Sequence, residues 1–257
     1  MNLSENRIPV PEQFPVESFA NIRHLVLGDM NYTWQDIEII AGDLPNLEVL
    51  QVHSNGLSNF TVTEGKFPVL QEIDLDENLI TTWEPVESLD TISSLQRIRL
   101  NHNKIKTINI TTEFKNLKSL QLISNLLEEW KYIGELDKLT NLTDLRLRHN
   151  PVLQQEKKES TSRAMIIALS SSVKILNGTV ITKEERNWAE LDYYKKHGLE
   201  YLKVVKMTDG PEKDEAMKVF SDEHRRYLDI VGKLGQPEEG ELLIKVILLH
   251  LSCITNL

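Results

Sequence analysis

Charged and polar side chains that could bind a partner protein occur at alternate positions of regularly spaced short segments. The candidate partner-binding residues are Glu72, Asp74, Asp76, Arg97, Arg99, Asn101, Gln121, Asp144, Arg146 and Arg148. An arginine guanidinium presents a planar fork of donors that matches a carboxylate. Arginines gathered on one face of an acidic protein therefore predict a docking surface for the carboxylates of a partner. The alternative is a solvated face on which pairs such as Asp74 with Arg99 neutralise each other, each pair contributing about 0.2–1 kcal/mol.

No set of side chains is arranged for catalysis. The sequence contains no glycine-rich phosphate loop, no G-x-S-x-G elbow and no H-E-x-x-H pair. His53, His102 and His149 lie near related turns, but stacked repeats would hold them too far apart to share one metal ion. The single cysteine, Cys253, lies in an apolar tail and is expected to be buried rather than nucleophilic. We therefore predict a protein that is not an enzyme and that has no catalytic, metal-binding or cofactor-binding residues.

The segments that carry the candidate residues repeat the pattern L-x-x-L-x-L-x-x-N-x-L, with Ile or Val at some aliphatic positions. Copies begin at residues 47, 70, 95, 117 and 142, so successive starts are 23, 25, 22 and 25 residues apart. A looser copy begins at Ile22, with Met30 at the asparagine position and Asn31 one place late. This motif and this period are typical of the leucine-rich repeat. The predicted fold is an α/β leucine-rich repeat solenoid with a curved parallel sheet and a mixed helical and extended convex side.

Each repeat has a physical reason to stack on the next. The alternation at the L-x-L centre predicts a short strand with one face buried and one face outward. Burying each inward Leu, Ile or Val contributes roughly 1.5–3 kcal/mol, and no single repeat can bury these side chains alone. The outward positions, and with them the candidate binding residues, are then expected on the concave face. The asparagine amide is expected to bond backbone groups of the turn after the strand.

The connections between the strands are of two kinds. Three longer ones carry Trp34, Trp83 and Trp130 at the start of apolar residues with helical spacing. They predict helices, with the tryptophans wedged into the core. Two shorter connections, residues 59–70 and 107–117, are rich in Thr, Val and Ile. They predict extended chain, with short strands as a further expectation.

The repeat pattern occupies residues 1–152, and its first copy is incomplete. Leu3, Asn6 and Ile8 match the end of an earlier repeat, because Leu3 precedes Leu27 by one period of 24 residues. We expect the natural protein to extend further towards its N-terminus. Residues 153–182 predict a cap, in which one helix closes the hydrophobic stack through Met165, Ile166 and Leu169, and residues 173–176 form a last strand.

Residues 183–241 predict a helical extension followed by a linker. Thr182 and Glu185 have the spacing of a capping box at the start of a helix, which should turn Trp188, Leu191 and one of the two tyrosines at 193 and 194 inward. A second helix is predicted from residue 211 to 234, and a linker over residues 236–241. The apolar tail, residues 242–257, is expected to be the first strand of a further domain.

The composition of the whole chain is that of a folded intracellular protein. Its 257 residues are 40% hydrophobic and 26% charged, with a net charge of −10. The acidic balance argues against nucleic acid as a partner, and no stretch is long and apolar enough to span a membrane. One cysteine excludes a framework of internal disulfides and fits a reducing compartment. We predict a cytoplasmic location.

The residues beyond the repeats carry a more specific signal. Residues 147–198 contain the segment E-E-R-x-x-A-E-L-D-Y at Glu184 to Tyr193, and residues 220–242 read FSDEHRRYLDIVGKLGQPEEGEL. Both segments, together with LSENRIPVP at the start, resemble the tubulin-folding cofactor E family and its E-like relatives. The family's glycine-rich CAP domain has no counterpart in this sequence. Of its ubiquitin-like domain, residues 242–257 match at most the first strand.

The resemblance implies a non-enzymatic chaperone that binds α-tubulin and helps to assemble or dissociate the α/β-tubulin heterodimer, together with other tubulin-folding cofactors. It also implies association with the cytoskeleton. From the residues, we predict that the four arginines contact acidic tubulin while Glu72, Asp74 and Asp76 set the register. Arg99→Glu with Arg146→Glu should then weaken binding of α-tubulin. The alternative is a leucine-rich repeat adaptor of another kind, such as a phosphatase regulator or an axonemal scaffold.

Overall fold

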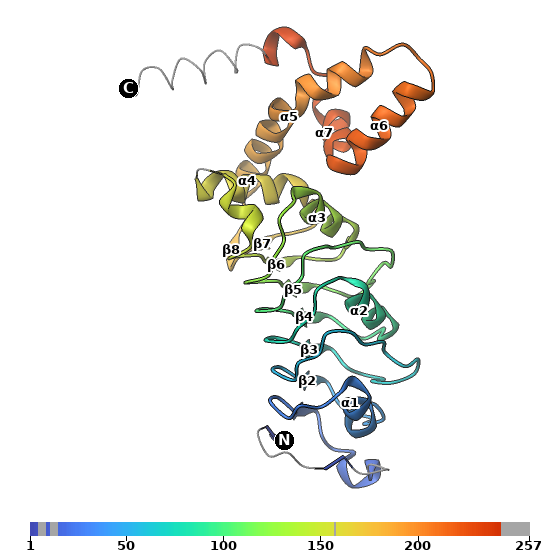
Figure 1. Cartoon of the computed structure of the whole chain (residues 1–257). Coiled ribbons are helices and arrows are strands. Elements are labelled where there is room, and N and C mark those ends of the chain that lie inside the picture. The colour runs from blue at the N-terminus through green and yellow to red at the C-terminus, as the bar shows by residue number, and fades with distance from the viewer. Residues whose placement is uncertain (5–8, 11–14, 157, 243–257) are drawn as a thin grey trace.

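The chain forms a stack of repeats that continues at one end into a helical extension. A computed structural model describes residues 1–4, 9–10, 15–156 and 158–242 (Figure 1). The strands run along one side of the stack, and helices α1–α3 lie on the opposite side (Figure 1). Among the described residues, no helix is both long enough and apolar enough to cross a bilayer. The architecture confirms the predicted leucine-rich repeat solenoid.

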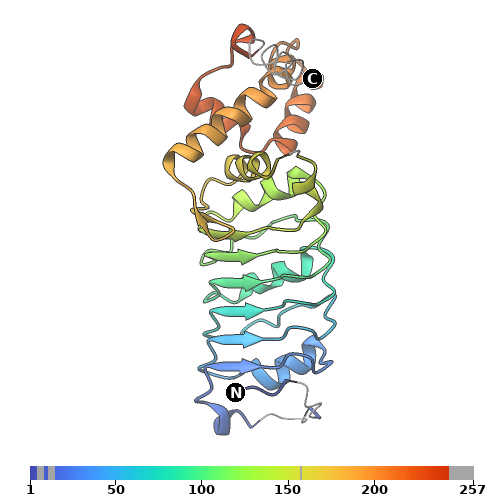
Figure 2. The ribbon, with the colours of Figure 1, turned by 90° about the vertical axis from the view of Figure 1, so that its left-hand side faces the viewer.

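Eight strands form one sheet in the order in which they occur along the chain, and Figure 2 views them from the sheet side. The first seven are parallel, and β8 turns back antiparallel to β7. They are β1 (His24–Val26), β2 (Val49–Gln51), β3 (Glu72–Asp74), β4 (Arg97–Arg99), β5 (Ser119–Gln121), β6 (Asp144–Arg146), β7 (Ile175–Leu176) and β8 (Thr179–Val180). The register aligns the central Leu or Ile of every parallel strand, and each of these side chains is buried.

The start of the chain adds one more rung beside β1. Asn2 forms a parallel bridge with Val26, and the backbone N–H of Leu3 donates to the carbonyl of Val26 at 2.9 Å. Leu3 therefore aligns with Leu27, as the 24-residue period predicts. Asn6 and Ile8, which complete the predicted partial repeat, lie outside the described residues.

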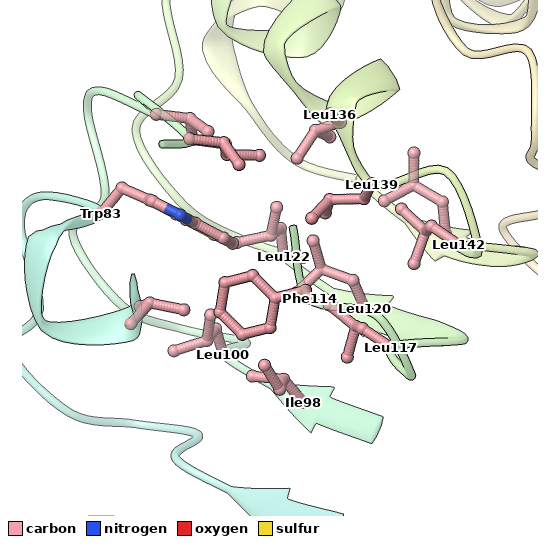
Figure 3. Packing of buried hydrophobic residues seen from close by; sticks show 14 of the residues in the cluster. Trp83, Ile98, Leu100, Phe114, Leu117, Leu120, Leu122, Leu136, Leu139 and Leu142 are labelled. Carbon is pink, nitrogen blue, oxygen red and sulfur yellow. The ribbon is translucent and has the colours of Figure 1, made fainter. Parts of the chain in front are cut away.

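Short helices cover the back of the sheet where the tryptophans predict them. They are α1 (Trp34–Ala41), α2 (Glu84–Glu87) with the 3-10 turn η2 (Ser88–Thr91), and α3 (Trp130–Glu135) with η3 (Leu136–Lys138). Thr33 begins α1 with a complete capping box to Asp36. Trp34 and Trp83 are buried in the core, whereas Trp130 is only partly buried. In Figure 3, Trp83 and Phe114 meet edge to face, with ring centroids 6.4 Å apart, among leucines of the sheet and of η3.

The two shorter connections are extended, as predicted. Residues 59–63 and 107–111 contain no strand, so the further expectation of short strands there is wrong. Their aliphatic side chains are buried, while Glu38 and Glu87 from the preceding helical connections accept hydrogen bonds from their backbone N–H groups. Carboxylates thus replace the strand partner that an extended backbone needs.

The turn asparagines form a buried ladder across the repeats. Each donates its amide to a backbone carbonyl of the previous repeat: Asn78 to Val52 at 3.2 Å, and Asn103 to Leu75 and Asn125 to Leu100, both at 2.9 Å. Their Oδ1 atoms accept from backbone N–H groups of that same repeat, as Asn125 does from Ile105 at 3.0 Å. The predicted role of the asparagines in the turn is confirmed, and the partners show that each one also joins two repeats.

The first repeat follows a different pattern. Met30 is buried at the asparagine position, and Asn31 is exposed. Asn55 of the next repeat still bonds the first repeat as the later asparagines bond theirs: it donates to the Leu27 carbonyl and accepts from the N–H groups of Met30 and Tyr32. The late asparagine is not part of the ladder.

The end of the stack is closed as predicted. Helix α4 (Glu159–Leu169) follows the 3-10 turn η4 (Pro151–Gln154) and buries Met165, Ile166 and Leu169. Strand β7 pairs with β6 and is the last parallel rung. Strand β8, which sequence reasoning did not predict, covers the outer edge of β7.

Three helices make up the extension: α5 (Lys183–Val205), α6 (Pro211–Glu223) and α7 (Tyr227–Leu234). Three predictions for this part are wrong in detail. The single helix expected over residues 211–234 is broken after Glu223, Trp188 is 71% exposed instead of inward, and the linker expected over 236–241 becomes helical at residue 239. Tyr193 and Tyr194 are both buried, and Leu191 is partly buried. Residues 243–257 of the predicted strand lie outside the described residues.

Candidate protein-binding face

All ten candidate residues lie on the side of the stack that the strands occupy, which we call the sheet face. Seven of them lie in the strands β3–β6, and the register sets Glu72 beside Arg97, Asp74 beside Arg99, and Gln121 beside Arg146. Asp76, Asn101 and Arg148 lie in the turns just after the strands, and Asp144 starts β6. Along each strand these positions alternate with the buried aliphatic residues. The strand backbone therefore determines that the polar side chains lie on the sheet face.

The acidic and basic rungs of β3 and β4 neutralise each other. The Nε of Arg97 lies 2.7 Å from Glu72 Oε2. The Nη2 of Arg99 lies 2.8 Å from Asp76 Oδ2, and its Nη1 lies 3.4 Å from Asp74 Oδ2. The cross-strand pairing that sequence reasoning left open is therefore present in the structure. The closer partner of Arg99 is Asp76, not Asp74.

A polar chain continues this network into β5. Asp76 Oδ1 accepts from the backbone N–H of Asn101 at 2.7 Å, and the Asn101 amide donates to Asp76 Oδ2 and to Gln121 Oε1, both at 3.1 Å. The side-chain oxygen of Asn101, Oδ1, accepts a hydrogen bond from the backbone N–H of Ile123 at 3.0 Å. Asp76 and Asn101 are buried. This arrangement holds the turns after β3, β4 and β5 together and leaves these side chains little freedom to meet a partner.

The electrostatics agree with this geometry. Burial raises the pKa of Asp74 above its usual range, in spite of the nearby Arg99 guanidinium. Although burial lowers the pKa of Arg99, the carboxylates of Asp76, Asp74 and Glu72 outweigh burial and raise it. Arg99 therefore remains charged and held among its own acids.

The arginines at the β6 end of the sheet face, Arg146 and Arg148, differ from Arg97 and Arg99 in their ion pairing. Among the described residues, neither Arg146 nor Arg148 has an ion-pair partner, and Arg148 is exposed. The Nε of Arg146 and the Oδ1 of Asp144 are buried, and neither has a hydrogen-bond partner within the described ranges of the chain. Arg148 also lines a cleft with Glu159, Arg163 and Asn177 at the junction with the cap. The structure thus divides the predicted arginines into a neutralised pair and a pair whose charge is available.

One group of side chains that could hold a metal ion lies elsewhere in the described part of the chain. His197, Glu200 and His224 each place a possible ligand atom within 4.8 Å of the others. This group differs from His53, His102 and His149, and the sequence does not single it out. The H-x-x-E spacing at residues 197–200 on a predicted helix could have placed its first two members on one face, but nothing in the sequence brings His224 to them.

Comparison with known proteins finds relatives over most of the chain. No family model matches the chain. Tubulin-specific chaperone E of Bos taurus is 33% identical over 255 residues, which cover 94% of this chain and 48% of the relative. The human protein of the same name is 30% identical over 254 residues, covering 94% and 47%. The chain is a homologue of tubulin-specific chaperone E. The family resemblance read from residues 147–198 and 220–242 is confirmed.

The chain spans about half the length of these curated relatives. Tubulin-folding cofactor E of Arabidopsis thaliana is 35% identical over 92 residues, or 34% of this chain. Among solved structures, a chain of the Drosophila melanogaster SNF/U2A' complex matches with a TM-score of 0.52 and 23% identity, over 60% of this chain and 86% of its own length. That likeness supports the solenoid fold alone.

Proposed function

We propose that this chain binds α-tubulin through its sheet face and works as a non-enzymatic tubulin-folding cofactor that assists assembly or dissociation of the α/β-tubulin heterodimer. The observation that carries the proposal is the similarity to tubulin-specific chaperone E over 94% of the chain. Cytoplasmic location, association with the cytoskeleton and contact with other tubulin-folding cofactors belong to the same proposal.

The charges of the sheet face support one part of it in particular. Arg97 and Arg99 already bind carboxylates of their own chain, so a partner would have to replace those bonds to reach them. Arg146 has no such bond and Arg148 is exposed, so a partner carboxylate gains two guanidinium groups without breaking an existing pair. We therefore assign docking of acidic tubulin to the β6 end of the face, and a register role to Glu72, Asp74 and Asp76.

The test is co-precipitation of purified tubulin with the chain. Arg146→Glu with Arg148→Glu should reduce tubulin binding about tenfold or more, because two attractive charges become repulsive. The residual binding should depend less on salt than that of the unchanged chain. Arg99→Glu with Arg146→Glu should also weaken binding. The first pair is the sharper variant, because Arg99→Glu also places a third carboxylate beside Asp74 and Asp76.

The matched control is Lys115→Glu with Lys131→Glu, which makes the same change in net charge. Both lysines are exposed and paired with neighbouring glutamates, and Lys131 lies on α3, away from the sheet face. Equal loss of tubulin from both double variants would contradict a role for the sheet face. Capture of phosphatase or dynein subunits from cell extract, without tubulin, would favour the adaptor function instead.

A further inference from the structure

The helical extension contains a cluster of two histidines and a carboxylate that the proposed tubulin binding does not use. His197 and Glu200 lie on consecutive turns of α5, and His224 directly follows α6. The Nε2 of His224 lies 3.3 Å from Glu200 Oε2, and the Nδ1 of His197 lies 3.7 Å from the same oxygen. We propose that His197, Glu200 and His224 form a binding site for a zinc ion.

The spacing of these atoms fits the metal. Zinc binds imidazole nitrogen and carboxylate oxygen at about 2.0–2.2 Å, so the ligand atoms of a tetrahedral site lie roughly 3.3–3.5 Å apart. The two separations from Glu200 are within a few tenths of an ångström of that range, and all three ligand atoms lie within 4.8 Å of one another. The rings of His197 and His224 are tilted by 42° to each other, with centroids 4.1 Å apart. Two imidazoles with one carboxylate favour zinc and similar transition metals over magnesium or calcium, which prefer oxygen ligands only.

The state of the two rings also suits a metal ligand. Burial, with a smaller effect of His224 and Lys196, lowers the pKa of His197 to about 3. Burial likewise lowers the pKa of His224, although Glu200 acts in the opposite direction. Burial thus favours the neutral imidazole, whose lone pair is the one that binds a metal.

The surroundings orient one ligand. The hydroxyl of Tyr193 lies 2.9 Å from Nδ1 of His224. With Nε2 of His224 on the metal, Nδ1 carries the proton and donates it to Tyr193, which is how ligating histidines are usually held. Tyr193 is buried against the ring of His197 as well, with centroids 4.6 Å apart. The side chain of Glu200 is 52% exposed, so the site opens to solvent and leaves the fourth position for water.

The ion would fix the geometry of the extension. Its ligands join α5 to the point where α6 ends and the chain turns into α7. Within the part of the chain that the structure describes, Glu200 is the one hydrogen-bond partner of His224 Nε2. A zinc ion at this point would hold the turn and the packing of α6 on α5. This role is independent of the sheet face, and it stands or falls separately from tubulin binding.

Titration of the purified chain with Zn²⁺, after removal of metals with EDTA, tests the site. We expect one Zn²⁺ per chain in the micromolar range or tighter, a higher thermal midpoint with zinc than with EDTA, and visible absorption bands of low-symmetry Co²⁺ when cobalt is used instead. Glu200→Gln, at a half-exposed position that should not disturb folding, is expected to weaken zinc binding about tenfold or more, and His224→Gln by a similar factor. Tyr193→Phe, which removes only the positioning hydroxyl, should weaken it by about tenfold.

The control is His102→Gln with His149→Gln, which removes two exposed histidines from the turns of the stack. Zinc binding that survives this change and fails in Glu200→Gln and His224→Gln supports the site. A chain that binds no stoichiometric zinc, or one whose zinc binding is unaffected by Glu200→Gln and His224→Gln, would overturn the proposal and leave Tyr193, His224 and Glu200 as an ordinary hydrogen-bonded group.

Discussion

The turn asparagines hold the stack together because each one bonds backbone groups of two repeats. Asn150 is fully buried: its amide donates to the carbonyls of Leu122 and Leu147 at 2.8 and 2.9 Å, and its Oδ1 accepts from Leu127 N–H at 3.2 Å. The residue before each of these asparagines has a positive φ, 60° for His149. This left-handed backbone conformation costs about 1–2 kcal/mol of folding free energy for a residue with a Cβ. The hydrogen bonds of the asparagine offset that cost.

We predict that Asn150→Ala lowers the free energy of unfolding by about 2–4 kcal/mol, because it leaves three buried backbone groups without partners. Urea denaturation followed by circular dichroism measures this change. Asn109→Ala, at an exposed position in an extended connection, is the control and should change it by less than about 0.5 kcal/mol. Similar small effects of both substitutions would mean that the ladder is not a major source of stability.

Only some of the charge pairs between side chains can be predicted from the sequence. The pair of Glu72 with Arg97 follows from the register, because equivalent positions of adjacent strands face each other. The bond from Arg99 to Asp76 does not follow, because Asp76 lies beyond the strand and its position depends on the conformation of the turn. The pairing of charges across repeats can thus be predicted within strands, where the backbone is regular, and less well in the turns.

At the scale of elements, one buried arginine joins the extension to the stack. Arg226 is 2% exposed, and its Nη1 donates to the carbonyl of Ala168 in α4 at 2.6 Å. Its Nη2 lies 3.1 Å from Glu190 of α5, and its Nε lies 3.7 Å from Asp137 of η3. The Arg226 guanidinium therefore contacts α4, α5 and η3. Without it, the Ala168 carbonyl and the carboxylates of Glu190 and Asp137 would lose this positively charged partner.

We predict that Arg226→Ala destabilises the protein by about 3–5 kcal/mol, because it leaves Glu190 as a buried charge that lacks its closest partner. Arg225→Ala is a matched control one residue away: Arg225 is 44% exposed and lies 3.9 Å from Glu135, so its loss should cost less than about 1 kcal/mol. Thermal unfolding of the two variants side by side decides the point. Equal midpoints would show that the junction does not depend on Arg226.

A second junction should depend on pH. Arg163 of α4 binds both carboxylate oxygens of Glu185 at 2.6 and 3.1 Å, and Arg186 adds to the positive charge around it. The hydrogen bond from Arg163 outweighs burial and holds the pKa of Glu185 below its usual range. A carboxylate with a lowered folded-state pKa adds stability above its unfolded pKa of about 4.3, and this stability is lost as the pH falls through the folded value.

Glu185→Gln should therefore lower the free energy of unfolding by about 0.5–1 kcal/mol at pH 7, a modest value because the side chain is 35% exposed. The difference from the unchanged chain should shrink as the pH falls below about 4 and through the folded-state pKa of Glu185. Urea denaturation at pH 7 and at pH 3 measures it. A penalty that is the same at both pH values would mean that the charge of Glu185 contributes nothing.

The wrong predictions for elements share one cause, which is tertiary contact. Thr182 caps α5 by accepting from the Glu185 N–H, as its spacing predicts, and the Glu185 side chain also binds Arg163, which the spacing does not predict. His197 faces the other helices of the extension. Trp188 lies about 180° around α5 from His197, and the Trp188 side chain therefore points to solvent. The break after α6 contains neither glycine nor proline, and it turns Arg226 towards α4. Periodicity alone could not predict these contacts between segments.

For the whole molecule, the period of the repeats was sufficient to predict the solenoid, its strands and its cap. Each repeat contacts mainly its neighbours, so local pattern determines the stack in a way that it does not determine the extension. The same pattern placed the candidate residues on one face. It could not show that Arg97 and Arg99 are neutralised by the chain itself while the arginines of the β6 rung keep their charge, since that difference arises from side-chain geometry.

The central claim is that the β6 end of the sheet face binds tubulin. Its most direct measurement is the dissociation constant of purified tubulin for the unchanged chain, for Arg146→Glu with Arg148→Glu, and for Lys115→Glu with Lys131→Glu, at two salt concentrations. We predict that the arginine variant binds about tenfold or more weakly and with less dependence on salt, while the lysine variant keeps the affinity of the unchanged chain. No binding of tubulin by the unchanged chain, or the same affinity for all three proteins, would contradict the claim.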